Sequence, residues 1–235
     1  MHRMTWRSAS ILAVALLSVV AVGCESQPAQ TYMNLPQPQL AQYSLEPAPK
    51  VVTPTVIDRP QVRQEPVESH PEWVHRGPAN RWKYIVIHHS ATDGGNAKVF
   101  DRAHRGRGWD ELGYHFVICN GNGGDCGKVE VGSRWRKQKW GAHTGGTPDN
   151  EYNNVGIGIC VVGSFQDSLP SRSQLNALRE LVTWLAAKYD IPAQNVIGHQ
   201  DAPNAATCCP GGRLHRYIKT VLRKDVAKLN IAQAD

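Results

Sequence analysis

The sequence predicts an α/β domain in which a mixed, mostly central β-sheet is flanked by helices. Short apolar runs rich in β-branched residues alternate with longer stretches of helical period, and glycine-rich or proline-containing turns separate them. A proline-rich first third precedes this pattern and lacks its periodicity. Of the 235 residues, 73–235 form a segment long enough to bury a core, so we place the folded domain there.

Residues 1–23 are typical of a lipoprotein signal peptide. Arg3 and Arg7 give a positive start, and the apolar run 11–22 is too short for an ordinary membrane-spanning helix. It ends in Gly23-Cys24, and small residues before a cysteine resemble the bacterial motif in which that cysteine is lipidated. A plain secretory peptide with an incidental cysteine is the alternative. We expect export to the cell envelope and a lipid anchor at Cys24.

Whether this anchor lies in the inner or the outer membrane stays open. Glu25 follows Cys24 instead of the aspartate that often marks inner-membrane retention, which favours the outer membrane. Residues 24–72 combine proline with glutamine, glutamate and alanine and contain few aromatics. Such a composition cannot bury enough apolar surface to offset chain entropy, and it predicts a disordered tether between anchor and domain.

Two kinds of pattern give the elements of residues 73–235. Apolar β-branched runs predict strands, at 83–88, 114–120, 128–131, 155–163 and 196–197. Amphipathic stretches predict helices, at 97–107, 171–189 and 214–229. Ser171 and Gln174 have capping-box spacing at the start of the second helix. The run 155–163 contains nothing that needs solvent, so we place that strand at the centre of the sheet.

The folded part carries the positive charge. From residue 73 onward it has 21 Lys and Arg against 14 Asp and Glu, which favours anionic partners such as cell-wall polymers or nucleic acid. A solvated surface excess with no partner is the alternative. No helix-turn-helix, zinc-finger or aromatic RNA-binding motif is present, so we expect no nucleic acid. The glycine-rich stretch 120–124 lacks the helix and lysine of a phosphate loop, which excludes nucleotide binding there.

The roles of four cysteines of the domain stay open. Disulfides are allowed in an exported protein, and Cys119 and Cys126 flank a glycine-rich stretch that they could staple. Cys160 lies in an apolar run and is typical of a small buried hydrophobe. Cys208 could be a thiol, a disulfide partner or a competing metal ligand.

Two histidines and one cysteine form a candidate metal site. His88 ends a predicted strand, His199 follows another, and Cys209 comes ten residues later on the same long turn. Either histidine alone would more often be a packed residue; the joint pattern indicates a metal. Imidazole and thiolate suit Zn²⁺, and three protein ligands are typical of a catalytic zinc, which keeps one position open for water.

The chain resembles the zinc-dependent N-acetylmuramoyl-L-alanine amidases of the type that includes bacteriophage T7 lysozyme and the peptidoglycan recognition proteins. The resemblance covers about residues 80–215. It is carried by Ile-His-His-Ser-Ala-Thr (87–92), Gly-Trp-Asp-Glu-Leu-Gly-Tyr-His-Phe (108–116), Gly-Ala-His-Thr-Gly-Gly (141–146), Tyr-Asn-Asn-Val-Gly-Ile-Gly-Ile (152–159), Gly-His-Gln-Asp (198–201) and Thr-Cys-Cys-Pro-Gly (207–211). Together and in this order these motifs are highly specific.

The resemblance implies the metal ligands His88, His199 and Cys209. The family's ligand cysteine directly precedes a proline, which selects Cys209 over its rival Cys208. The family's catalytic tyrosine falls on Tyr114, which would hold or help deprotonate the attacking water; strand packing is its alternative role.

Thr207 stands where phage-type members have a lysine and many recognition-type amidases have a threonine. There it would donate a hydrogen bond to the oxyanion. The resemblance also implies that His143, Tyr152 and Asn154 contact the substrate, because the family's glycan and stem-peptide groove runs past these positions. An ordinary turn is the alternative for the segment around His143.

The expected activity is hydrolysis of the amide between N-acetylmuramic acid and L-alanine in peptidoglycan. The expected cofactor is Zn²⁺, and the expected partners are peptidoglycan or muropeptides and, through Cys24, a membrane. We expect a monomer. Two alternatives stay open: a non-catalytic peptidoglycan-binding protein, and a zinc hydrolase that cleaves another amide, such as a stem-peptide bond.

Overall fold

The structure is a computed structural model that describes residues 70–232. The predicted signal peptide, the lipidation site Cys24 and nearly all of the predicted tether lie outside the described residues. Among residues 70–232 there is no helix with both the length and the apolar character needed to cross a membrane.

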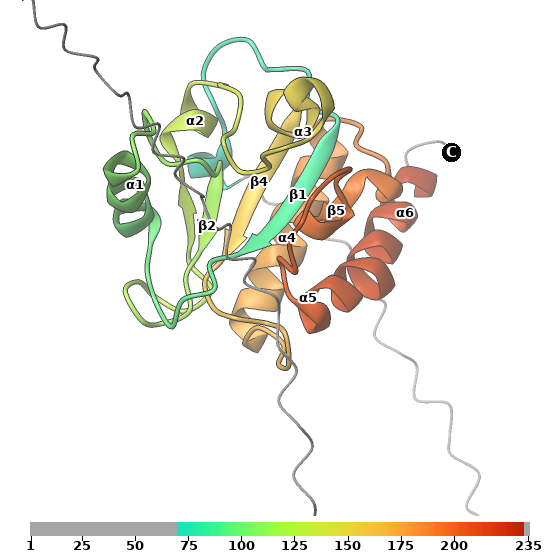
Figure 1. Cartoon of the computed structure of the whole chain (residues 1–235). Helices are drawn as coiled ribbons and strands as arrows, with labels where there is room; N and C mark the ends of the chain where they lie inside the picture. The colour runs from blue at the N-terminus through green and yellow to red at the C-terminus, as the bar shows by residue number, and fades with distance from the viewer. Residues whose placement is uncertain (1–69, 233–235) are drawn as a thin grey trace, which may run out of the picture. The chain divides into compact units, whose positions relative to one another are not determined.

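A five-stranded sheet in the order β3-β2-β4-β1-β5 forms the centre of the domain (Figure 1). Its strands are β1 (Tyr84–His89), β2 (Phe116–Ile118), β3 (Val129–Val131), β4 (Gly156–Val161) and β5 (Val196–Gly198). The pairs that join β2, β4, β1 and β5 are parallel, and β3 pairs with β2 antiparallel. The predicted mixed sheet is therefore confirmed, with β4 at its centre. All six residues of β4 are buried, as its continuous apolar sequence requires.

Helices cover the sheet and fill the chain between strands. They are α1 (Ala97–Gly106), α2 (Ser133–Arg136), α3 (Glu151–Asn154), α4 (Arg172–Lys188), α5 (Gly212–Tyr217) and α6 (Arg223–Ala232), with a π-helical turn at Ile218–Leu222. The capping box that opens α4 is present: Ser171 Oγ accepts from the Gln174 N–H, and Gln174 Oε1 accepts from the Ser171 N–H, both at 3.2 Å. The C-terminal helix predicted at 214–229 is present as α5 and α6, which the π-helical turn joins.

The sheet has one face for the core and one for the candidate site, because successive side chains of a strand point to opposite faces. Odd-numbered β1 and β4 residues such as Ile87 and Ile159 join α4, α5 and α6 in the main hydrophobic core. The even-numbered residues, among them His88 and Cys160, point to the other face. A smaller apolar cluster there includes Phe100 of α1.

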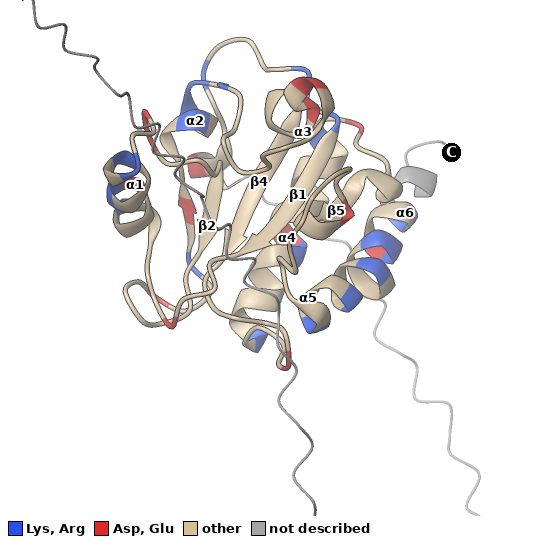
Figure 2. Cartoon of the chain, in the orientation of Figure 1, with Lys and Arg blue, Asp and Glu red and all other residues tan. Residues whose placement is uncertain are grey.

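Lysine and arginine residues occur on α1, on α2 and on the C-terminal helices α5 and α6 (Figure 2). On α1 they include the exposed Lys98, Arg102 and Arg105, of which Arg105 pairs with Asp101 four residues earlier. The positive excess counted in the sequence is therefore at the surface, where an anionic partner could meet it, and the binding of such a partner stays a prediction.

Gly158 of β4 lies against the ring of His143 so closely that no larger residue fits. A Cβ at Gly158 would come within 2.6 Å of His143 Cγ and 2.7 Å of Nε2, with both atoms buried. We therefore expect Gly158→Ala to lower the free energy of unfolding by about 1–3 kcal/mol, the usual cost of overpacking. Gly106→Ala is the control, since a Cβ there meets nothing within 4 Å. Equal urea-unfolding midpoints for the two variants would contradict this prediction.

Candidate metal centre and active site

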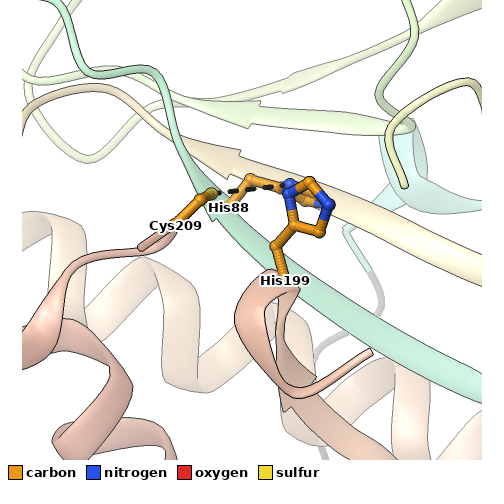
Figure 3. A group of neighbouring side chains, drawn as sticks. All are labelled: His88, His199 and Cys209. Carbon is orange, nitrogen blue, oxygen red and sulfur yellow. Dashed lines mark hydrogen bonds between the residues drawn. The ribbon is translucent and has the colours of Figure 1, made fainter. Parts of the chain in front are cut away.

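The three predicted metal ligands meet on the sheet face opposite the main core. His88 comes from β1, His199 follows β5, and Cys209 lies on the loop before α5. One ligand atom of each side chain lies within 4.8 Å of those of the other two. Figure 3 shows the two imidazoles and the thiol converging, with the contact between Cys209 Sγ and His88 Nδ1, 3.7 Å long, drawn as a dashed line.

Local hydrogen bonds bring the last two ligands together. The Gln200 N–H donates to the Cys209 carbonyl oxygen at 2.8 Å and so joins the turn after β5 to the cysteine loop. Asp201 closes the same turn, because its Oδ2 accepts from the Gly198 N–H at 3.1 Å and its Oδ1 accepts from His215 Nε2 at 2.8 Å. The Gly-His-Gln-Asp sequence therefore fixes the backbone from which His199 projects.

The donor set fits a zinc ion. With Zn–S of about 2.3 Å and Zn–N of about 2.05 Å, a tetrahedral site separates sulfur from nitrogen by about 3.6 Å, and the observed separation of Cys209 Sγ and His88 Nδ1 is 3.7 Å. His88 Nε2 is engaged on its other side by His143 Nδ1 at 3.1 Å, so Nδ1 is the nitrogen that faces the thiol. These three residues would hold the metal.

Burial keeps the three ligands uncharged in the metal-free protein. It lowers the pKa of His88 well below 6.5, with His143 and His199 nearby adding to the effect, and it lowers the pKa of His199. Burial also raises the pKa of the Cys209 thiol to about 12, although a 3.4 Å hydrogen bond from the His89 N–H acts in the other direction. Both imidazoles are thus in their ligand form, and metal binding would release a proton from the thiol.

Tyr114 lies beside the metal ligands. Its ring centroid is 5.3 Å from that of His88 and 5.5 Å from that of His104. Burial raises the pKa of its phenol well above 10, and the neighbouring thiols of Cys160 and Cys209 raise it further. The phenol is therefore protonated at neutral pH and can donate a hydrogen bond toward the site.

Thr207 has a hydrogen to donate. Its Oγ1 accepts from the Cys209 N–H at 3.1 Å, which anchors the hydroxyl oxygen next to the ligand and leaves its own hydrogen to turn elsewhere. This geometry suits the donor role predicted for Thr207, which stays a prediction.

The predicted substrate contacts differ in exposure. His143 is 8% exposed, whereas Asn154 is exposed and donates through Nδ2 to the Asp149 carbonyl at 3.0 Å. Tyr152 lies on α3 with its ring centroid 4.6 Å from that of Tyr84. Their contact with substrate stays a prediction.

Asn153, which the sequence did not single out, holds the segment that contains His143. Its Oδ1 accepts from the His143 N–H at 2.7 Å and the Thr144 N–H at 2.9 Å, and its Nδ2 donates to the Thr144 carbonyl at 2.9 Å. The neighbouring pair Asn153-Asn154 offers no local signal to show which side chain turns inward, because the choice depends on contacts across the fold.

The structure places the remaining cysteines as follows. Cys119, Cys126 and Cys160 are free thiols, so the staple considered for Cys119 and Cys126 is not formed. Cys126 Sγ is instead 3.2 Å from Ser171 Oγ. Cys160 is fully buried, as expected of a small hydrophobe in an apolar strand. Cys209 is also a free thiol and available to a metal.

We expect the metal-free protein to lose stability in mild acid, because burial lowers the pKa of its buried imidazoles. Burial lowers the pKa of His115 to about 4. Between pH 6.5 and 4 the unfolded chain binds the proton that folded His115 refuses, so stability is full above pH 6.5 and falls as the pH drops through this window. For His115 alone we expect a loss of about 2 kcal/mol from pH 7 to pH 5. Urea unfolding measures it.

The His115→Asn variant separates this effect from that of the carboxylates. Asp110 and Glu111, with pKa values held at about 2 by their lysine and hydroxyl partners, lose their contribution at lower pH. The variant should therefore show a weaker dependence on pH between 7 and 5. An identical dependence in parent and variant would contradict the assignment to His115.

The fold and the site define a class: an α/β protein with a candidate catalytic metal centre of two histidines and one cysteine on one face of its sheet. Residues 78–212, more than half of the chain, match the family model described as N-acetylmuramoyl-L-alanine amidase. The chain therefore belongs to the N-acetylmuramoyl-L-alanine amidase family, and the resemblance seen in the sequence is confirmed.

Similar proteins carry two kinds of name. The chain is 30% identical over 151 residues to an N-acetylmuramoyl-L-alanine amidase of Sus scrofa. This match covers 58% of this chain but only 23% of that protein. It is 33% identical over 147 residues to peptidoglycan recognition protein 1 of Bos indicus, covering 58% of this chain and 70% of that protein. Among solved structures, the endolysin amidase LysCS of Clostridium intestinale superposes with a TM-score of 0.50 at 26% identity, covering 67% of this chain and 91% of that one.

Proposed function

We propose that this protein is a zinc-dependent N-acetylmuramoyl-L-alanine amidase that hydrolyses the amide between N-acetylmuramic acid and L-alanine in peptidoglycan. The observation that carries the proposal is the convergence of ligand atoms of His88, His199 and Cys209 within 4.8 Å of one another, with Cys209 Sγ 3.7 Å from His88 Nδ1 and the phenol of Tyr114 beside them. Membership of the amidase family supports the choice of bond.

The side chains have separate tasks in this reaction. Zinc, when bound, supplies a Lewis acid that lowers the pKa of water and polarises the scissile carbonyl. Tyr114 orients the attacking water through its phenol, and Thr207 donates its hydroxyl hydrogen to the oxygen that becomes negative as the water adds. The C–N bond then breaks, the carboxylate stays on the muramic acid, and the amine of L-alanine leaves with a proton.

The rival function is peptidoglycan binding without catalysis, and several relatives are named for peptidoglycan recognition. Such a binder needs neither a ligand thiol nor a catalytic phenol. Here Cys209 is a free thiol 3.7 Å from His88 Nδ1, and Tyr114 is in ring contact with the same histidine. Both features support catalysis over binding alone.

Product analysis tests which bond is cut. The full-length protein with zinc is incubated with muropeptides and the products are identified by mass spectrometry. The proposal expects free stem peptides that begin with L-alanine, and disaccharides that keep the lactyl carboxylate. Fragments cut within the stem peptide would instead support a hydrolase for another amide, and bound but uncut muropeptides would support the binder.

A further inference from the structure

His143 lies behind His88, on the side away from the thiol of Cys209. His88 Nε2 is 3.1 Å from His143 Nδ1, and His143 Nε2 is 3.2 Å from the carbonyl oxygen of Gly156. Both imidazole rings are fully or almost fully buried, at 1% and 8% exposed. The two rings and the carbonyl therefore form a chain of hydrogen bonds that ends at the candidate metal centre.

The carbonyl at the end of this chain fixes both tautomers. A carbonyl oxygen only accepts, so His143 Nε2 must carry the hydrogen that it donates to Gly156. In a neutral ring the other nitrogen is then an acceptor, so His143 Nδ1 accepts from His88 Nε2–H. His88 Nδ1 is left with its lone pair toward Cys209 Sγ, 3.7 Å away, which is the direction a metal ligand needs.

The hydroxyl of Thr144 is compatible with this assignment. Thr144 Oγ1 is 2.8 Å from His143 Nδ1, so its hydrogen can share the single lone pair of that nitrogen with His88 Nε2–H. The opposite tautomer of His143 would turn a nitrogen lone pair toward the Gly156 carbonyl oxygen inside the protein. Two acceptors facing each other in a buried site are unfavourable, so the opposite tautomer is disfavoured.

Packing holds the His143 ring where the chain of hydrogen bonds needs it. The ring lies against Gly141 and Gly158, and a Cβ at either would come within 2.5 or 2.7 Å of His143 Nε2. Asn153 fixes the backbone of His143 from the other direction, with its Oδ1 accepting from the His143 N–H at 2.7 Å. The fixed ring of His143 therefore holds His88 in one orientation through the hydrogen bond between them.

We infer that His143 is a positioning residue of the metal centre, which holds His88 in the tautomer and orientation that present Nδ1 to a zinc ion. The inference rests on the proposed zinc function and deepens it, because it assigns His143 a task within the protein beyond the substrate contact predicted from the sequence. Histidine ligands generally depend on such a partner at their other nitrogen, and its loss weakens metal affinity by about 10–100-fold.

Zinc dissociation constants, measured in the full-length protein by competition with a chelating dye, test the inference. His143→Ala removes the acceptor and should raise the dissociation constant by about 10–100-fold. His143→Asn should restore most of the affinity, because its amide oxygen can take the place of Nδ1. His104→Ala is the matched control: its imidazole is also 8% exposed but is not bonded to His88, so zinc affinity should not change.

A second readout does not depend on a variant that folds. Two-bond ¹H–¹⁵N correlation spectra of the metal-free parent protein report which imidazole nitrogen is protonated. We expect Nε2–H for both His88 and His143. Nδ1–H on His88, or unchanged zinc affinity in folded His143→Ala, would overturn the inference. Failure of the parent itself to bind zinc would instead count against the proposed function, and the tautomers would still be measurable.

Discussion

Cys209→Ala is expected to lose both zinc and hydrolysis, with zinc affinity falling by more than about 100-fold. Loss of a partner that merely orients a ligand costs about 10–100-fold in metal affinity, so the loss of a ligand itself should exceed that. Cys209 supplies the only thiolate of the candidate set found among the described residues, and the alanine leaves two imidazoles. Zinc titration and muropeptide turnover measure the two effects in the same preparations.

The neighbouring Cys208 provides the matched control for this experiment. Cys208 is exposed, whereas Cys209 is 8% exposed and faces His88. Cys208→Ala should therefore keep both zinc affinity and turnover. If Cys208→Ala loses zinc and Cys209→Ala keeps it, the assignment of the ligand to the residue before Pro210 is wrong.

Tyr114→Phe is expected to keep zinc and lose most turnover. The substitution removes one oxygen from a side chain that is in ring contact with His88 but is not a ligand. A positioned acid or base contributes about 10²–10⁴-fold to the rate, so kcat should fall by at least about 100-fold while the zinc dissociation constant stays the same. Steady-state turnover of muropeptides and zinc titration measure the two quantities.

Tyr217→Phe controls for the loss of any phenol. Tyr217 is half-buried on α5 and packs against the main core, on the face of the sheet away from the candidate site. Turnover in Tyr217→Phe should match the parent. If Tyr114→Phe also turns over at the parent rate, Tyr114 serves only to pack beside His88.

Most of the sheet could be predicted, because a short apolar run in the sequence is by itself enough to indicate a buried strand. The apolar runs around β1, β4 and β5 are buried strands, and the capping box at Ser171 begins α4 as its spacing indicates. The π turn at Ile218–Leu222 could not be predicted, since the apolar stripe continues through it without a break. The boundaries of β2 were also set too wide, because pairing with β4 ends at Ile118.

The candidate ligands could be predicted as a set, since an imidazole–imidazole–thiolate combination has few other uses. The contacts that other side chains make with these ligands could not be predicted. His143 and Asn153 are separated from His88 by more than fifty residues, and their inward orientation follows from β1–β4 pairing and from the space left by Gly158. Tyr114, by contrast, was predicted from the family resemblance, and it lies two residues before β2 begins at Phe116.

The decisive experiment measures muropeptide turnover by the full-length protein after complete removal of metal and then during stepwise addition of zinc. We expect no turnover in the metal-free protein, and full recovery at one zinc per chain with release of peptides that begin with L-alanine. Turnover that survives metal removal, or a protein that binds one zinc and muropeptides without cutting them, would contradict the proposed zinc amidase.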